Sequence, residues 1–190
     1  MTPTPDEIRA LHKELAPSAE AFDLVYTHCE IVWTLAAQLI EANNLNVDAE
    51  LVRAGCLLHD IGVHLLAGSE YIRHGILGEK LLLARGFSPV LARFCAHHTG
   101  VGITRDDVLA QKLPLPATDY LADSGEERLL MYADKFHTKS TPPVFVTAPT
   151  YAKSLRRFGA AHTARFSALV TEYGEPDLTP LSRRYGHPVT

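Results

Sequence analysis

The hexapeptide LLHDIG at residues 57–62 decides the fold of this chain. It closes the segment AELVRAGCLLHD, whose apolar residues recur at helical spacing after a capping Asn46 or Asp48. We therefore expect His59 and Asp60 in the last turn of a helix that stops at Ile61 and Gly62. An imidazole and a carboxylate in such an apolar segment are costly to bury without a partner.

More imidazoles and another carboxylate lie in similar apolar, helix-patterned segments on both sides of LLHDIG. They are His28, His74, the adjacent pair His97 and His98, and Asp134. Imidazole nitrogens suit Fe, Mn, Zn, Co or Ni, and carboxylates bridge cations or hold them in place. A metal centre is the simplest common partner for so many costly groups.

The rest of the chain is predicted to be helical, with no convincing strand pattern. Caps, stops and apolar spacing predict helices at residues 5–15, 18–43, 49–60, 69–85, 89–98, 105–112, 125–138, 151–173 and 176–185. Residues 101–125 otherwise form a long loop, and residues 139–150 are expected to be extended or irregular. The predicted architecture is an all-α bundle whose ligand-bearing helices face inward.

Composition narrows the class of protein. A chain of 190 residues with 46% hydrophobic and 21% charged residues is typical of one globular domain. A net charge of −4 gives no reason to expect a nucleic-acid polymer or an anionic membrane as partner. The N-terminus does not have the pattern of a signal peptide and no apolar run is long enough to span a bilayer, so we expect a cytoplasmic protein.

Three cysteines, Cys29, Cys56 and Cys95, show no metal-binding spacing and are odd in number. We interpret them as small buried hydrophobes in a reducing compartment, with a thiolate ligand as the minor alternative.

The ordered set H…HD…H…H…D, with HDIG at its second element, resembles the HD-domain superfamily of metal-dependent phosphohydrolases. The resemblance covers roughly residues 28–139. Within the superfamily, the chain is similar to small, poorly characterised bacterial and archaeal HDIG proteins through HTGVGIT at 98–104, ADKFHTKS at 133–140 and GEPDL at 174–178. It implies a single HD domain over residues 1–190, with a core at about 18–140 and with residues 5–15 and 150–185 as helical appendages.

The resemblance also implies two divalent transition-metal ions, which could be Fe, Mn, Co, Ni or Zn. The first would be held by His28, His59, Asp60 and Asp134. The second would be held by His74 and His98, with Asp60 bridging the two. His97 is either an alternative ligand or a residue that faces the substrate.

Such a pair of ions, roughly 3.5–4 Å apart, can clamp a phosphate and make water reactive. Asp60 would be central to catalysis, and His64, one helical turn beyond it, is either a proton donor, a partner of a ligand or solvent-exposed. Candidates to contact the phosphate are Arg73, Lys135 and Lys139, with Arg156 and Arg157 as more distant ones. Each of these side chains is alternatively a solvated surface charge.

The remaining histidines, His12, His137, His162 and His187, are expected to have no metal role. Residues 101–116 are expected to shape substrate access.

The expected function is hydrolysis of a small, nucleotide-like phosphomonoester or phosphodiester. Cyclic di-GMP is not the expected substrate. The branch of the superfamily that hydrolyses it carries a GYP signature and a lysine directly after HDIG, whereas this chain has TGVGIT after His98 and Val63 after HDIG. The same ligand set also serves mixed-valent di-iron oxygenases, which consume O₂. A non-catalytic nucleotide-sensing domain is a third alternative, although no ligand is lost here, and homodimer formation is left open.

Overall fold

The computed structural model describes residues 2–190 and confirms the predicted all-α class. The α-helices are α1 (Pro5–Leu15), α2 (Ala19–Asn43), α3 (Ala49–Leu58), α4 (His74–Ala84), α5 (Pro89–Ala96), α6 (Arg105–Ala110), α7 (Gly125–Ala133), α8 (Ala148–Leu155), α9 (Ala160–Tyr173) and α10 (Thr179–Tyr185). Short 3₁₀ helices are η1 (Ile61–Leu65), η2 (Tyr71–Arg73), η3 (Asp134–Phe136) and η4 (Arg156–Phe158). Within the described residues, β-structure is limited to isolated bridges.

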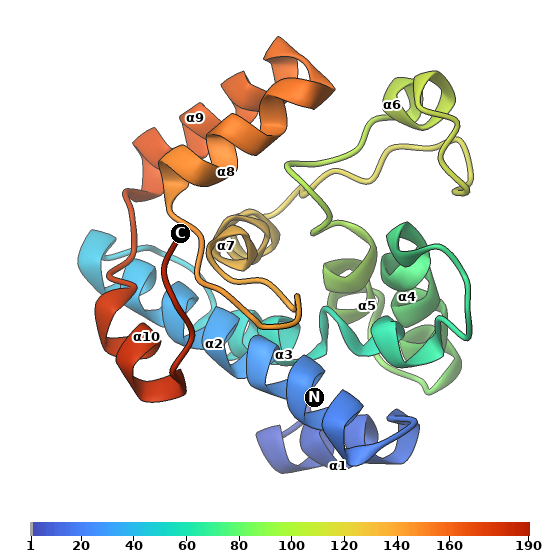
Figure 1. Cartoon of the computed structure of the whole chain (residues 1–190). Coiled ribbons are helices and arrows are strands. Elements are labelled where there is room, and N and C mark those ends of the chain that lie inside the picture. Colours follow the sequence, from blue (N-terminus) through green and yellow to red (C-terminus); the bar gives the residue numbers. More distant parts are fainter. Residues whose placement is uncertain (1) are drawn as a thin grey trace.

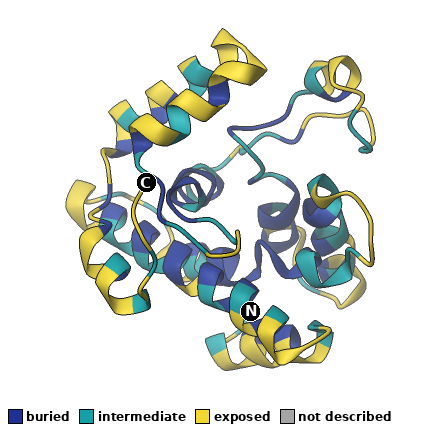
Figure 2. Cartoon of the chain, viewed as in Figure 1, coloured by how far each residue is buried: buried dark blue, intermediate teal, exposed yellow. Residues whose placement is uncertain are grey.

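Helix α7 lies at the centre of the molecule, where it packs against α2, α3, α5 and α9 (Figure 1). The α4–α5 pair lies on one side of α7 and the α8–α9 pair on the other, while α6 sits on a long excursion between them. Burial follows this arrangement, because the buried residues concentrate on α7 and on the faces of α2, α3 and α5 that surround it (Figure 2). The inward faces of these helices thus form the core that holds the site.

Polar caps fix where several helices begin, as the sequence predicts. Thr4 forms a full capping box with Glu7 at the start of α1. Asp48, rather than Asn46, caps α3 by accepting bonds from the backbone N–H groups of Glu50 and Leu51. Ser124 does the same for α7, so each side chain satisfies N–H groups that the helix leaves free.

Helix α3 ends two residues earlier than the sequence predicts. The helix ends at Leu58, so His59 is its capping residue and Asp60 lies in the bend before η1. Gly62 allows η1 to pack closely against α4, since a Cβ there would lie 2.0 Å from the carbonyl oxygen of His74. Only glycine permits η1 and α4 to approach this closely, which brings His74 toward Asp60.

Other boundaries also differ from the prediction. The helix expected from Ser69 begins only at His74, because residues 71–73 before it form the separate 3₁₀ helix η2. The single late helix expected over 151–173 is two helices, α8 and α9, divided at Gly159 with φ 102°. The last helix begins at Thr179 rather than at residue 176.

The three cysteines are free and buried, as predicted. Burial raises the pKa of each thiol, so all three favour the neutral form. Among residues 2–190, no helix combines the length and apolar character that a membrane crossing requires.

Helix α1 is joined to the core through His12, whose ring is fully buried. Its Nε2 donates to the carbonyl of Leu57, at 2.8 Å, and its Nδ1 lies 3.1 Å from Nε2 of His64. Burial lowers the pKa of His12 to about 4. The folded protein therefore keeps this ring neutral at pH values where an exposed histidine is charged.

We expect the free energy of unfolding to fall as the pH is lowered from 6.5 to 4. In this window the unfolded chain binds a proton at His12 that the folded protein does not, which costs up to about 3 kcal/mol. Replacing His12→Gln should remove this contribution, so the stability gap between wild type and variant in urea unfolding should narrow as pH falls. Parallel stability curves for the two proteins across this window would contradict the assignment.

Candidate metal centre

Six side chains from different parts of the chain converge near the C-terminal end of α3. His28 comes from the middle of α2, while His59 and Asp60 follow the end of α3. Helix α4 begins with His74, His98 follows the end of α5, and Asp134 follows α7. Five of the six positions are thus at or just beyond helix ends, where backbone bends can turn adjacent side chains toward one point.

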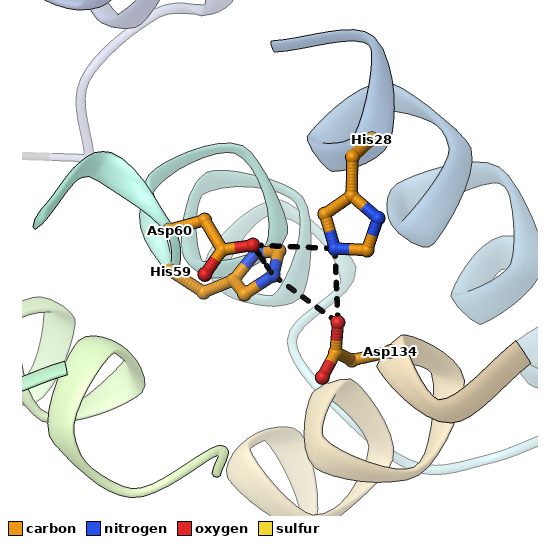
Figure 3. A group of neighbouring side chains, drawn as sticks. All are labelled: His28, His59, Asp60 and Asp134. Atoms are coloured by element: carbon orange, nitrogen blue, oxygen red, sulfur yellow. Dashed lines mark hydrogen bonds and ion pairs between the residues drawn. The ribbon is translucent and has the colours of Figure 1, made fainter. Parts of the chain in front are cut away.

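One group consists of His28, His59, Asp60 and Asp134, drawn in Figure 3. Nε2 of His28 lies 2.9 Å from Asp134 Oδ1 and 3.3 Å from Asp60 Oδ2. Nε2 of His59 lies 3.1 Å from Asp60 Oδ2 and 3.5 Å from Asp134 Oδ1. Two imidazole nitrogens and two carboxylate oxygens therefore surround one point.

A second group consists of Asp60, His74 and His98. Here the other carboxylate oxygen, Asp60 Oδ1, lies 3.3 Å from Nε2 of His74 and 3.6 Å from Nε2 of His98. The two Nε2 atoms are 3.0 Å apart. Asp60 is therefore shared between the groups, with one oxygen facing each.

The chemistry of these donors fits a metal. His28, His59 and Asp60 are fully buried, and His74 and His98 nearly so. Both Asp60 oxygens and Nε2 of His59 lie at ion-pair distances from their neighbours, yet none makes a hydrogen bond of good geometry. Buried polar atoms left in this way are costly, and a cation bound among them would satisfy all of them at once.

Hydrogen bonds at the opposite ring nitrogens set the orientation of the imidazoles. Nδ1 donates to a backbone carbonyl in His59 (Cys56, 2.7 Å), His74 (Tyr71, 2.7 Å) and His98 (Phe94, 3.0 Å). A proton on Nδ1 leaves the lone pair of Nε2 free to bind a metal. Each carbonyl belongs to the turn next to its histidine, so helix geometry itself selects the tautomer.

His28 has a different partner, which the sequence did not reveal. Its Nδ1 lies 2.9 Å from Nδ1 of His137, and Nε2 of His137 lies 2.9 Å from Nδ1 of His187. If His28 donates, His137 accepts and donates in turn to His187. His137 was expected to have no metal role, and it lies outside both groups, but it orients a member of the first.

Electrostatics favour carboxylates that are ionised. Burial opposes the charge on Asp60, but His59 and Lys139 outweigh it and hold the pKa of Asp60 well below its usual range. Burial lowers the pKa of His98 to about 4, which keeps this imidazole neutral at physiological pH. For His59, burial is outweighed by Asp60, whose carboxylate raises the pKa of the imidazole. Without a metal this ring therefore holds a second proton on Nε2, which a bound metal would displace.

A cavity of about 430 Å³ opens beside the centre. Its walls include His74, His98 and Asp134, together with both predicted lysines, Lys135 and Lys139. Lys135 is buried, and its Nζ donates to Asp134 Oδ2, at 2.6 Å, and to the carbonyl of His98, at 3.0 Å. The ammonium group of Lys139 forms an ion pair with Asp60 Oδ2 and borders the open space.

The other predicted residues do not line this cavity. His64 turns toward His12, and Nδ1 of His97 donates to the carbonyl of Leu121, at 2.6 Å. Arg73 is half-buried on η2, and Arg156 and Arg157 are exposed on η4. The tyrosines Tyr71 and Tyr151 do line it, and no motif in the sequence points to them.

Comparison with known families agrees with this geometry. The profile of the HD domain matches residues 25–139, a stretch that contains all six converging residues. The chain belongs to the HD-domain family.

Three curated relatives of this HD domain are archaeal proteins. The chain is 40% identical over 120 residues to an uncharacterized protein of Methanocaldococcus jannaschii. This match covers 60% of this chain and 68% of that protein. The chain is 37% identical over 130 residues to a tRNA (cytidine(56)-2′-O)-methyltransferase of Picrophilus torridus and 34% identical over 130 residues to one of Thermoplasma volcanium. Those two matches cover 68% of this chain but only 36% of each methyltransferase.

Solved structures share the fold at lower identity. The HD domain of the L. monocytogenes phosphodiesterase PgpH, in complex with cyclic-di-AMP, matches with a TM-score of 0.54 and 14% identity, over 97% of this chain and 99% of that one. A second crystal structure of the PgpH HD domain matches with a TM-score of 0.53 and 15% identity, over 94% of this chain and 98% of that one.

We expect His137→Phe to weaken metal binding about tenfold or more, because His28 would lose the partner that orients it. His137→Gln keeps a hydrogen-bond acceptor and should retain most of the affinity. The measurement is the dissociation constant for Mn²⁺, obtained by competition with a chelating dye. A Phe variant that binds Mn²⁺ as tightly as the wild type would show that His137 does not position His28.

Proposed function

We propose that this HD domain is a metal-dependent phosphohydrolase that acts on a small phosphate ester. The observation that carries the proposal is the position of the Asp60 carboxylate. One oxygen faces His28 and His59, and the other faces His74 and His98. A carboxylate shared in this way suits the bridging ligand of a two-metal site.

We assign two divalent transition-metal ions to the two groups. The first would bind His28, His59, Asp60 and Asp134, and the second would bind Asp60, His74 and His98. The second group offers fewer protein ligands and borders the cavity, so it has room for water and a substrate oxygen. When bound, the ions would supply a reactive water and positive charge for phosphate hydrolysis.

The side chains around the cavity have separate tasks in this proposal. Lys139 is the residue best placed to contact a phosphate, because its ammonium borders the cavity beside Asp60. Lys135 instead holds Oδ2 of Asp134, which directs Oδ1 toward His28. Thr138 and Ser140 also line the cavity, where the Ser140 hydroxyl donates to the carbonyl of Pro142, at 2.8 Å.

The relatives give general support to a phosphorylated substrate. The PgpH domain with the same fold is a phosphodiesterase crystallised with cyclic-di-AMP, a small phosphodiester. The name methyltransferase belongs to whole proteins in which the matched part is 36% of the length. The cluster of imidazoles and carboxylates here supports hydrolysis rather than methyl transfer.

We expect Asp60→Asn to lower the metal content from about two ions per chain to less than one and to reduce phosphodiesterase activity more than about a hundredfold. Loss of the shared negative charge weakens both sites together. Metal content is measured by mass spectrometry after loading with Mn²⁺, and activity with bis(p-nitrophenyl) phosphate. Glu127→Gln is the matched control, since Glu127 is a buried carboxylate outside the centre.

Two single-site variants sharpen this test. His28→Ala should affect the first ion and His74→Ala the second, so each should leave about one ion per chain. Full metal content in Asp60→Asn would remove the bridging role. Turnover that requires O₂, rather than proceeding anaerobically with Mn²⁺, would replace hydrolysis by the oxygenase alternative.

A separate prediction concerns Lys139. Its ammonium pairs with an Asp60 oxygen that the proposed metal would also use, so the two cations compete. We expect Lys139→Met to tighten Mn²⁺ binding roughly threefold or more and to raise KM for the phosphate ester. The exposed Lys153→Met is the control. An unchanged Mn²⁺ affinity together with an unchanged KM would refute both roles.

A further inference from the structure

A second cavity, of about 300 Å³, adjoins the cavity beside the metal centre. The two cavities share four wall residues, Tyr71, Thr99, Gly100 and Tyr151. A molecule whose phosphate lies at the metal centre can therefore extend directly into the second space. The volumes of both cavities are in the range that small ligands occupy.

The walls of the second cavity differ in character from those of the first. Beyond the shared residues they are mostly apolar, with Ile72, Ile103, Leu113, Leu155 and Phe158. The first cavity has the charged and metal-binding side chains described above. This division suits a substrate that has an anionic end and an apolar end.

Aromatic side chains are unusually exposed at this cavity. Tyr71 is 52% exposed and Phe158 is 41% exposed, although both rings are large and largely apolar. Tyr151 lies between the two cavities as a third ring. Aromatic rings around an open apolar space provide faces on which another planar ring can stack.

Polar groups are few and are placed among these apolar walls. His162 is buried, and its Nδ1 has no hydrogen-bond partner, while its Nε2 lies 3.6 Å from Asp107 Oδ1. Gln111 and Glu70 also belong to the wall. A small set of donors and acceptors in an apolar pocket is typical of sites that recognise the polar edge of a planar group.

We propose that the second cavity is a specificity subsite for an aromatic ring carried by the phosphate ester. This inference rests on the proposed function and narrows its substrate to aryl or nucleoside-like phosphates. Part of the wall comes from Tyr151, Leu155, Phe158 and His162, which follow the end of the HD-domain match at residue 139. The subsite is therefore a property of this chain's C-terminal helices as well as of its HD core.

The test compares inert phosphonates that share the anionic end and differ in the ring. On Mn²⁺-loaded protein, calorimetry should give (1-naphthyl)methylphosphonate an affinity at least about tenfold higher than methylphosphonate, because the ring buries apolar surface. Phe158→Ala and Leu113→Ser should remove most of this preference without weakening methylphosphonate. Leu109→Ala is the matched control, since Leu109 is exposed on α6 and lies outside the walls of both cavities.

A third ligand, 1-naphthol, separates this inference from the proposed function because it has no phosphorus. Equal affinities of the two phosphonates, or a preference that survives both variants, would overturn the subsite and leave the phosphate site in place. If neither phosphonate bound but 1-naphthol did, and Phe158→Ala weakened it, the ring site would stand and the phosphohydrolase would fall. Binding of none of the three would overturn both.

Discussion

The buried carboxylate of Asp60 is the constraint on which the rest of the structure depends. A fully buried negative charge is very costly unless cations or hydrogen-bond donors surround it. Here its neighbours are imidazoles from α2, α3, α4 and α5 and the ammonium of Lys139. Four helices must therefore meet at one point, and the central position of α7 brings Asp134 to the same place.

Backbone geometry makes this meeting possible. The chain bends after Leu58 into η1, and Gly62 lets η1 lie directly against the start of α4. That contact places His74 on the opposite side of Asp60 from His28. The glycine of the HDIG motif is thus explained by packing, while the histidine and aspartate are explained by charge.

Much of this was predictable from sequence, because it depends on local signals. The caps at Thr4, Asp48 and Ser124 and the all-α class follow from residues close together in the chain. The six converging residues could be named because polar side chains in apolar helical segments need partners. Their assignment as metal ligands remains a prediction, although the structure brings all six together.

What the sequence did not reveal depends on contacts between distant segments. His137 meets His28 across 109 positions, so no local pattern distinguished it from an ordinary histidine. Lys135 looked like a phosphate contact, but its buried Nζ is already bonded to Asp134 and to the His98 carbonyl. The division of residues 148–173 at Gly159 was missed because the apolar spacing on both sides is helical, and the positive φ that the glycine permits decides the break.

In the proposed function, the first cavity holds the reacting phosphate and the second cavity selects the group attached to it. The converging imidazoles and carboxylates all lie in the segment that the HD-domain profile matches, whereas α8, η4 and α9 add part of the wall of the second cavity. Changes in those later helices can alter the shape of the wall without moving a helix end that bears a ligand. Relatives that keep the same ordered histidines and aspartates can therefore differ in the group that a phosphate carries, and a shared ligand set alone does not define a shared substrate.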